Sequence, residues 1–230
     1  MKWIVIGTPS PFREHLINGL PEKDIVGVIF ESAKDAQINF EINAAFEDKI
    51  YSKFIVEQNL KLKYYHTTNV NSLYCLELIK YLTSISFESV NIMLTGANKI
   101  KRNNLDKLNA MPNIKNIINV HMGDCFQYRG LDSNLWALYH RDFNSLGISI
   151  HYVENILDAG SRILHHRIDK PDSYADLIDR QIITTTKAIT SVSNIFEQTD
   201  KPIVQTNDAL GRYYGFMPAQ LKQHLFQRYS

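Results

Sequence analysis

The sequence predicts an α/β fold with a Rossmann-like, doubly wound and mostly parallel sheet. Short apolar runs typical of buried strands alternate with segments in which apolar residues recur at helical spacing. Strands that alternate with helices through short links favour a parallel sheet with helices on both faces. The 230 residues suit one domain with an addition. We expect a main domain over residues 1–198 and a C-terminal extension over residues 199–230.

The first half of the chain opens with a strand, a helix and a second strand. Residues 3–6 and 25–30 are apolar runs of strand length, and residues 12–20 between them carry apolar side chains on one helical face. Residues 32–47 are polar and lack a clear period, which favours a loop. The remaining elements expected here are a helix over 47–59, a strand over 62–65 and a helix over 70–84.

The second half continues this alternation. Residues 90–94 are a run of strand length that is apolar except for Asn91, and a further strand is expected over 114–120, with a short helix over 105–110 between them. The other elements expected are a helix over 133–139, strands over 147–153 and 162–168, and a long helix over 174–196.

The tail that follows Pro202 is too apolar and aromatic for a free extension. Gly211 and Gly215 bracket residues 212–214, which favours a turn or a short strand, and residues 218–226 favour a terminal helix. Two arrangements stay open at this point. The tail packs on its own sheet, or it contributes to a contact with a second copy of the chain.

Composition and charge exclude several classes of protein. The 25 Lys and Arg residues nearly balance the 24 Asp and Glu residues, so the chain lacks the basic excess typical of nucleic-acid-binding proteins. No apolar run approaches the ~18 residues of a membrane helix, and the apolar start before Pro9 is too short for a signal peptide. Cys75 and Cys125 are typical of reduced thiols. We therefore expect a cytoplasmic protein without nucleic-acid or membrane partners.

Polar side chains gather where two predicted strands end. Asn119 and His121 are two residues apart at the end of one strand, so they face the same side. Asp158 follows the strand over 147–153. Because the active sites of doubly wound sheets lie beyond the carboxyl ends of the strands, we expect these three residues at one site. An amide, an imidazole and a carboxylate can together polarise a carbonyl and move a proton.

Two further features of the sequence do not indicate a nucleotide-binding or metal-binding site. Residues 7–9, Gly-Thr-Pro, match neither the dinucleotide-binding fingerprint nor a P-loop. His165 and His166 are adjacent in a predicted strand and point to opposite faces, and no carboxylate or cysteine completes a ligand set. We therefore expect no metal site.

Residues 119–130, which read Asn-Val-His-Met-Gly-Asp-Cys-Phe-Gln-Tyr-Arg-Gly, and residues 157–160, which read Leu-Asp-Ala-Gly, resemble the core of the folate-dependent formyltransferase family. The hallmark of that family is an Asn-x-His at a strand end, followed by an Arg-Gly and by an Asp in a Leu-Asp-x-Gly loop. Residues 96–100 resemble the folate-binding loop that precedes the Asn-x-His strand.

This resemblance implies the formyltransferase fold and the transfer of a formyl group from 10-formyltetrahydrofolate to an amine. It implies that Asn119 donates to the formyl oxygen and that His121 acts as a base or as a cationic stabiliser. Asp158 would orient the His121 ring or favour its protonated, charged form. Whether His121 or Asp158 takes the amine proton stays open.

The resemblance also implies the binding residues. The folate would lie against the loop formed by Leu94, Gly96, Asn98, Lys99 and Ile100. We expect the acceptor near Thr8 and near Arg129, Trp136 and Tyr139, because the last three lie close to the three catalytic residues in sequence. Trp136 and Tyr139 are three residues apart and share a helical face, and we expect at least one of them to lie in the core.

Among family members, the small sugar-nucleotide N-formyltransferases are the most similar. They imply a nucleotide-linked amino sugar as acceptor, such as a dTDP-linked 4-amino-4,6-dideoxyhexose, a role in O-antigen and lipopolysaccharide biosynthesis, and a homodimer. Three alternatives remain. They are a folate-dependent formyltransferase for another small amine, a hydrolase of formyltetrahydrofolate, and a non-catalytic protein of the same fold.

Overall fold

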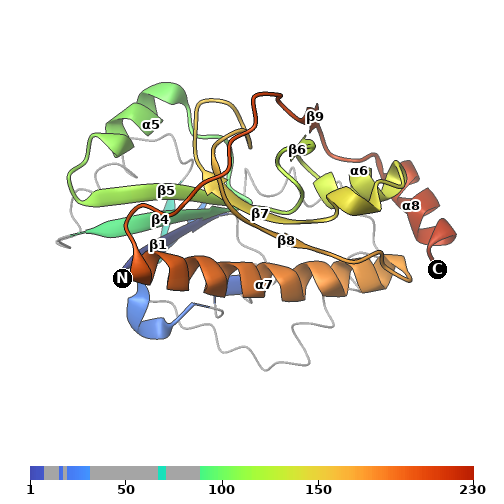
Figure 1. The fold of residues 1–230 in the computed structure, drawn as a ribbon, viewed down its shortest axis with the longest axis horizontal. Coiled ribbons are helices and arrows are strands. Elements are labelled where there is room, and N and C mark those ends of the chain that lie inside the picture. The colour runs from blue at the N-terminus through green and yellow to red at the C-terminus, as the bar shows by residue number, and fades with distance from the viewer. Residues whose placement is uncertain (8–15, 18–19, 32–66, 71–88) are drawn as a thin grey trace.

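Seven strands form the central sheet of the computed structural model, in the order β3-β2-β1-β4-β5-β7-β8 (Figure 1). The structure describes residues 1–7, 16–17, 20–31, 67–70 and 89–230. The strands of this sheet are β1 (Trp3–Gly7), β2 (Ile25–Glu31), β3 (Thr67–Val70), β4 (Val90–Thr95), β5 (Ile114–His121), β7 (Gly147–Tyr152) and β8 (Arg162–Arg167).

The predicted mostly parallel sheet is confirmed. The strands from β3 to β5 in this order pair in parallel. The last two strands differ, because β7 runs antiparallel to β5 and β8 runs antiparallel to β7. Antiparallel neighbours need only a short loop between them, whereas parallel neighbours need a crossover. The short link between β7 and β8 fits this arrangement.

The helices of the described residues are α5 (Arg102–Asn109), α6 (Ser133–Tyr139), α7 (Tyr174–Gln198) and α8 (Ala219–Arg228), with 3-10 turns η1 (Glu22–Asp24) and η2 (Phe143–Ser145). The helices predicted over 133–139, 174–196 and 218–226 are confirmed. The elements predicted over 47–59 and 62–65, all but the first residue of the helix predicted over 70–84, and most of the helix over 12–20 lie outside the described residues. Within the part of the chain that the structure describes, no helix is both long and apolar enough to span a bilayer.

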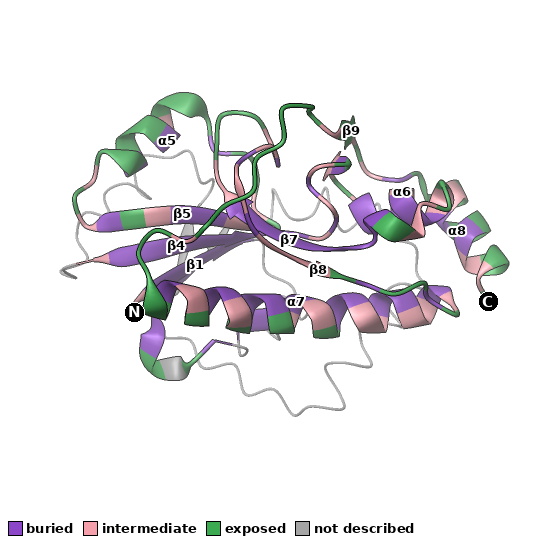
Figure 2. Ribbon diagram, viewed as in Figure 1, coloured by how far each residue is buried: buried purple, intermediate pink, exposed green. Residues whose placement is uncertain are grey.

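The sheet separates two apolar cores, because alternate residues of a strand point to opposite faces. Trp3 and Val5 of β1 belong to the core that α7 covers, which we call the α7-side core. Ile4 and Ile6 belong to the core that α5 covers. Figure 2 shows the buried strands and the buried inner stripe of α7. A doubly wound sheet thus buries both faces.

A buried asparagine joins α6 to the sheet and to α7. Asn134 is 1% exposed. Its amide nitrogen donates to the Gly147 carbonyl at 3.0 Å and to Gln181 Oε1 at 2.9 Å, and its oxygen accepts from the Gly147 N–H at 3.0 Å. These bonds satisfy a polar side chain that would otherwise be costly to bury, and they align α6, β7 and α7.

The C-terminal tail packs on the chain itself. The short strand β9 (Arg212–Tyr214) pairs in parallel with β6 (Tyr128–Gly130). Met217 and Leu225 are fully buried in the α7-side core. Lys222 Nζ of α8 lies 3.1 Å from Asp132, whose carboxylate also accepts from the Met217 N–H at 2.9 Å. Packing on its own core, one of the two arrangements expected for the tail, is therefore present.

Candidate active site

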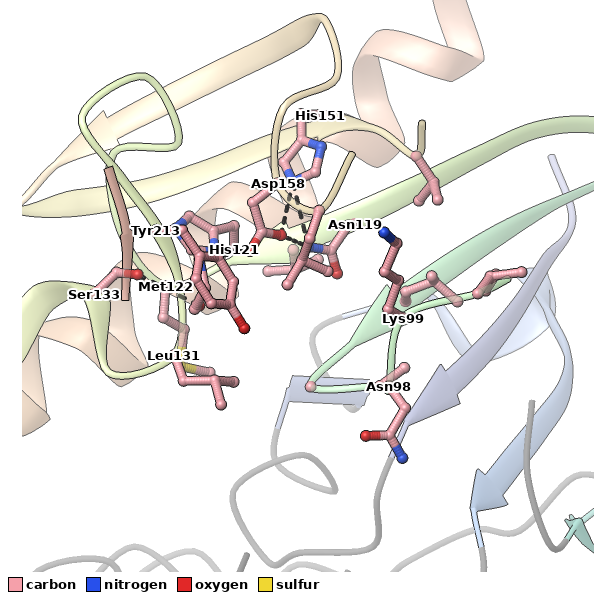
Figure 3. A pocket seen from close by; sticks show the side chains of 18 of the residues that line it. Asn98, Lys99, Asn119, His121, Met122, Leu131, Ser133, His151, Asp158 and Tyr213 are labelled. Carbon is pink, nitrogen blue, oxygen red and sulfur yellow. Dashed lines mark hydrogen bonds and ion pairs between the residues drawn. The ribbon is translucent and has the colours of Figure 1, made fainter. Parts of the chain in front are cut away.

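A pocket of about 410 Å³ lies at the ends of β4 and β5 (Figure 3). Its centre is formed by Asn119 and His121 of β5, His151 of β7, and Asp158 of the loop between β7 and β8. Residues 96–100, which follow β4, form one side. The other side is formed by residues 130–133 together with Tyr213 and Phe216 of the tail. The structure therefore brings the three predicted catalytic residues together.

Strand register and a tight loop position the central residues. Asn119 of β5 lies directly opposite His151 of β7, and opposed residues point to the same face. We expected Asp158 beyond the carboxyl end of a parallel strand, and this expectation is wrong, because β7 is antiparallel. The loop turns back and returns Asp158 to the site. A Cβ atom at Gly160 would lie 1.8 Å from the Tyr152 carbonyl oxygen, so glycine is required for this close return.

Asp158 is the centre of the polar network. Its Oδ1 accepts from Asn119 Nδ2 at 2.9 Å, and its Oδ2 accepts from the Gly130 N–H at 2.9 Å. His121 Nδ1 lies 3.5 Å from Oδ2, and His151 Nε2 lies 3.4 Å from Oδ1. The two N–H donors, from Asn119 and Gly130, stabilise a carboxylate that is only 6% exposed.

The backbone sets the proton positions of the two histidines. His121 Nε2 lies 2.8 Å from the Tyr128 carbonyl oxygen, and His151 Nδ1 lies 2.8 Å from the Tyr152 carbonyl oxygen. Because a carbonyl only accepts, these nitrogens carry the protons of the neutral rings. His151 Nε2 then accepts from Asn119 Nδ2 at 3.2 Å. The basic nitrogen of His121, Nδ1, faces the Asp158 carboxylate.

Burial keeps His121 neutral, so it can act as a base, and the groups around Asp158 keep its carboxylate charged. Burial lowers the pKa of His121 below its ordinary value of 6.5, although the Asp158 charge opposes this. Burial alone would raise the pKa of Asp158, but His121, His151 and the Gly130 N–H outweigh it, and the pKa lies well below its usual range. At neutral pH the pair can therefore take up one proton.

Comparisons with known proteins bear on the fold. The sequence matches no protein-family model and no curated protein. Its structure is similar to a 4-N formyltransferase from Francisella tularensis, with a TM-score of 0.59 and 13% identity over 93% of this chain and 76% of that chain. A formyltransferase from Anoxybacillus kamchatkensis, solved with UDP-4,6-dideoxy-4-formamido-L-AltNAc and tetrahydrofolate, has a TM-score of 0.57 and 14% identity over 98% and 90% of the chains.

A third structure extends the similarity. An N-formyltransferase from Helicobacter canadensis, solved with folinic acid and dTDP-3-aminofucose, has a TM-score of 0.55 and 13% identity over 94% of this chain and 71% of that chain. This chain has the formyltransferase fold. The predicted fold class is thereby confirmed.

Within this formyltransferase fold, the predicted folate-binding loop lies on one side of the pocket. Its members Leu94, Gly96, Asn98, Lys99 and Ile100 all line the pocket. Asn98 and Lys99 lie across the Asn119–Asp158 pair from Tyr213 (Figure 3). Thr8, predicted to contact the acceptor, lies outside the described residues.

The other residues predicted to contact the acceptor point elsewhere. Trp136 stacks on Tyr214 with ring centres 5.0 Å apart, and its Nε1 donates to the Gly215 carbonyl. Tyr139 packs against the α7-side core. Trp136 packs against the same core, so both aromatic residues are half-buried against it and neither lies fully in it, and Trp136 is also held by the tail.

Arg129 holds the site together from outside the pocket. Its Nε donates to the Gly211 carbonyl at 2.7 Å, and its Nη1 donates to the Leu157 carbonyl at 3.0 Å. Leu157 precedes Asp158, whose φ of 50° lies in the left-handed region. Arg129 therefore ties the strained loop that carries Asp158 to the tail, because its planar fork reaches both carbonyls.

His151 and Tyr213 are among the pocket residues that the sequence analysis did not predict. His151 lies in the middle of the network, but the only sequence signal is a histidine near a strand end. Tyr213 lies in a three-residue strand that shows no periodicity. Both positions depend on pairing between strands, which alternation along one strand does not reveal.

Other reactive side chains near the site have structural roles. Burial raises the pKa of the Cys125 thiol to about 12, so this residue is not a nucleophile at neutral pH. His165 Nδ1 lies 3.0 Å from Ser149 Oγ, and that hydroxyl donates to the Gly123 carbonyl. Among the described residues, no group of three or more potential ligands could hold a metal ion.

The state of His121 predicts how activity depends on pH. A base must be uncharged to accept a proton, so we expect turnover to be constant above pH 7 and to fall in acid, with a midpoint below 6.5. In Asp158→Asn the anion that favours the imidazolium is lost, so the pKa of His121 should fall further. NMR titration of the His121 ring measures this pKa directly. A rate that rises in acid would contradict the role as a base and favour a cationic stabiliser.

Proposed function

We propose that the protein is an N-formyltransferase that moves the formyl group of 10-formyltetrahydrofolate to the amine of a nucleotide-linked amino sugar. The observation that carries this proposal is the contact set of Asp158, with the amide of Asn119 at 2.9 Å and the imidazole of His121 at 3.5 Å in one pocket. Two proteins of the same fold were solved with folates and nucleotide sugars. That supports the same classes of substrate here.

In this reaction His121 and Asp158 handle the proton. Attack of the amine on the formyl carbon forms the new C–N bond and gives a cationic nitrogen. His121 Nδ1 accepts the proton that this nitrogen loses, and the Asp158 charge stabilises the resulting imidazolium. The same proton moves to the folate nitrogen as its bond to the formyl carbon breaks, so atoms and charges balance.

Asn119 stabilises the negative charge that develops on the formyl oxygen. Its Nδ2 donates to Asp158 at 2.9 Å and to His151 at 3.2 Å. The formyl oxygen must displace one of these partners, and we expect the longer contact, to His151, to give way. A single donor to such an oxyanion is worth about 3 kcal/mol in the transition state.

Formyl transfer by the purified full chain tests the proposal. The assay offers 10-formyltetrahydrofolate with a panel of dTDP- and UDP-linked amino sugars, including 4-amino-4,6-dideoxyhexoses. We expect release of tetrahydrofolate and an acceptor that is heavier by one formyl group, and Asp158→Asn serves as the control for uncatalysed transfer. Tetrahydrofolate release without acceptor would instead indicate a formyltetrahydrofolate hydrolase. The cytoplasmic location and the role in O-antigen or lipopolysaccharide synthesis stay predictions.

We also propose a homodimer whose contact includes the tail or α7, since symmetric pairs are the commonest assemblies. Both segments carry exposed apolar side chains, Ile183 on α7 at 49% and Ile203 in the tail at 95%. Light scattering at micromolar concentration should give the mass of two chains. Ile183→Asp and Ile203→Asp report which segment takes part, because a charge in the contact should give monomers. A monomeric wild-type protein would contradict this proposal.

A further inference from the structure

The tail presents one aromatic ring to the pocket and keeps the next one away from it. Tyr213 is 58% exposed and lines the pocket. Its neighbour Tyr214 points the other way and stacks on Tyr128 and Trp136, with ring centres 5.4 and 5.0 Å apart. Alternation along β9 therefore directs Tyr213 to the pocket and Tyr214 to an aromatic stack.

The Tyr213 ring packs against Gly130 at the end of β6. A Cβ atom at Gly130 would lie 2.9 Å from Tyr213 Cε2 and 2.1 Å from the Tyr214 carbonyl oxygen. The ring therefore rests on the Gly130 backbone, whose N–H donates to Asp158 at 2.9 Å. Gly130 therefore lies between the exposed ring of Tyr213 and the Asp158 carboxylate.

The two sides of the pocket differ in aromatic surface. Residues 96–100 on one side include no aromatic residue, whereas Tyr213 and Phe216 lie on the other side with residues 130–133. Figure 3 shows Asn98 and Lys99 on one side of the Asn119–Asp158 pair and Tyr213 on the other. If the formyl donor occupies the loop of residues 96–100, the amine must approach His121 from the side of Tyr213.

We propose that Tyr213 binds the sugar ring of the acceptor and helps to determine which acceptor is used, an inference that rests on the proposed function. A pyranose ring presents a face of C–H groups, and an aromatic ring presents a negative face that these groups contact favourably. The contact with Gly130 already places the ring of Tyr213 at the pocket.

Separate Michaelis constants for the two substrates test this role. In Tyr213→Ala we expect the KM for a dTDP-linked 4-amino-4,6-dideoxyhexose to rise about tenfold, which is the effect of losing one aromatic contact. The KM for 10-formyltetrahydrofolate and kcat should stay within about twofold, because the contact is the same in ground and transition states. Tyr213→Phe should behave as wild type, and Tyr213→Leu should resemble the alanine variant, since it is apolar but lacks the ring face.

Leu210→Ala is the matched control, because Leu210 is a similarly exposed tail residue, at 55%, outside the pocket. It should leave both KM values unchanged. An unchanged acceptor KM in Tyr213→Ala, an equal rise for both substrates, or the same rise in Leu210→Ala would overturn the role of Tyr213 while leaving the proposed function in place. A wild-type protein that formylates no amino sugar would overturn the proposed function, and this inference with it.

Discussion

Removing any one of Asn119, His121 and Asp158 should lower formyl transfer by about 100-fold or more without unfolding the protein. Asn119→Ala loses the donor to the formyl oxygen, and His121→Ala loses the proton acceptor. Asp158→Ala loses the charge that stabilises the imidazolium, together with the acceptor for Asn119 and the Gly130 N–H. Single-turnover rates with saturating substrates measure the effect, and circular dichroism verifies the fold.

His224→Ala provides the matched control for this series. His224 is an exposed residue of α8 and does not line the pocket. Its variant should keep the wild-type rate. Near-normal turnover in the Asp158 variant would remove that residue from the mechanism, and near-normal turnover in all three would remove the proposed site.

Asn134→Ala should destabilise the folded protein by about 3 kcal/mol, because three buried hydrogen bonds are lost and their partners stay buried. For a chain of this size such a loss lowers the melting temperature by about 10 °C. Thermal unfolding followed by circular dichroism measures it. Asn134 lies outside the pocket, so activity at low temperature should persist.

Asn194→Ala makes the same chemical change at an exposed position of α7. It should leave the melting temperature within about 2 °C of the wild-type value, since surface substitutions have small effects. Equal melting temperatures for the two variants would show that the Asn134 bonds contribute little to the free energy of unfolding.

Much of the sheet could be predicted because its strands are continuous apolar runs. Residues 3–6 and 90–94 are buried on both faces, and such runs show in the sequence without knowledge of their partners. The direction of β7 and β8 could not be predicted, since it depends on how the chain turns between them. The three-residue strands β6 and β9 are too short to show a period.

The residues of the candidate site differ in the same way, because some could be predicted from one strand alone and others depend on how strands pair. Asn119 and His121 could be paired from the sequence, because two residues on one strand share a face whatever the strand pairs with. His151 joins them only through the register between β5 and β7. Arg129 looked like a substrate contact because of its neighbours in sequence, but two backbone carbonyls hold its guanidinium.

The pairing of β6 with β9 also affects the order in which the sides of the pocket form during protein synthesis. The ribosome completes the strands that carry Asn119, His121 and Asp158 well before it makes Tyr213, and contacts between distant parts of a chain form late. A nascent chain thus carries its reactive groups in a pocket that is open on one side. Residues 212–217 close that side only after they too have left the ribosome. A chain released early would retain the reactive groups but lack the side of the pocket that holds Tyr213.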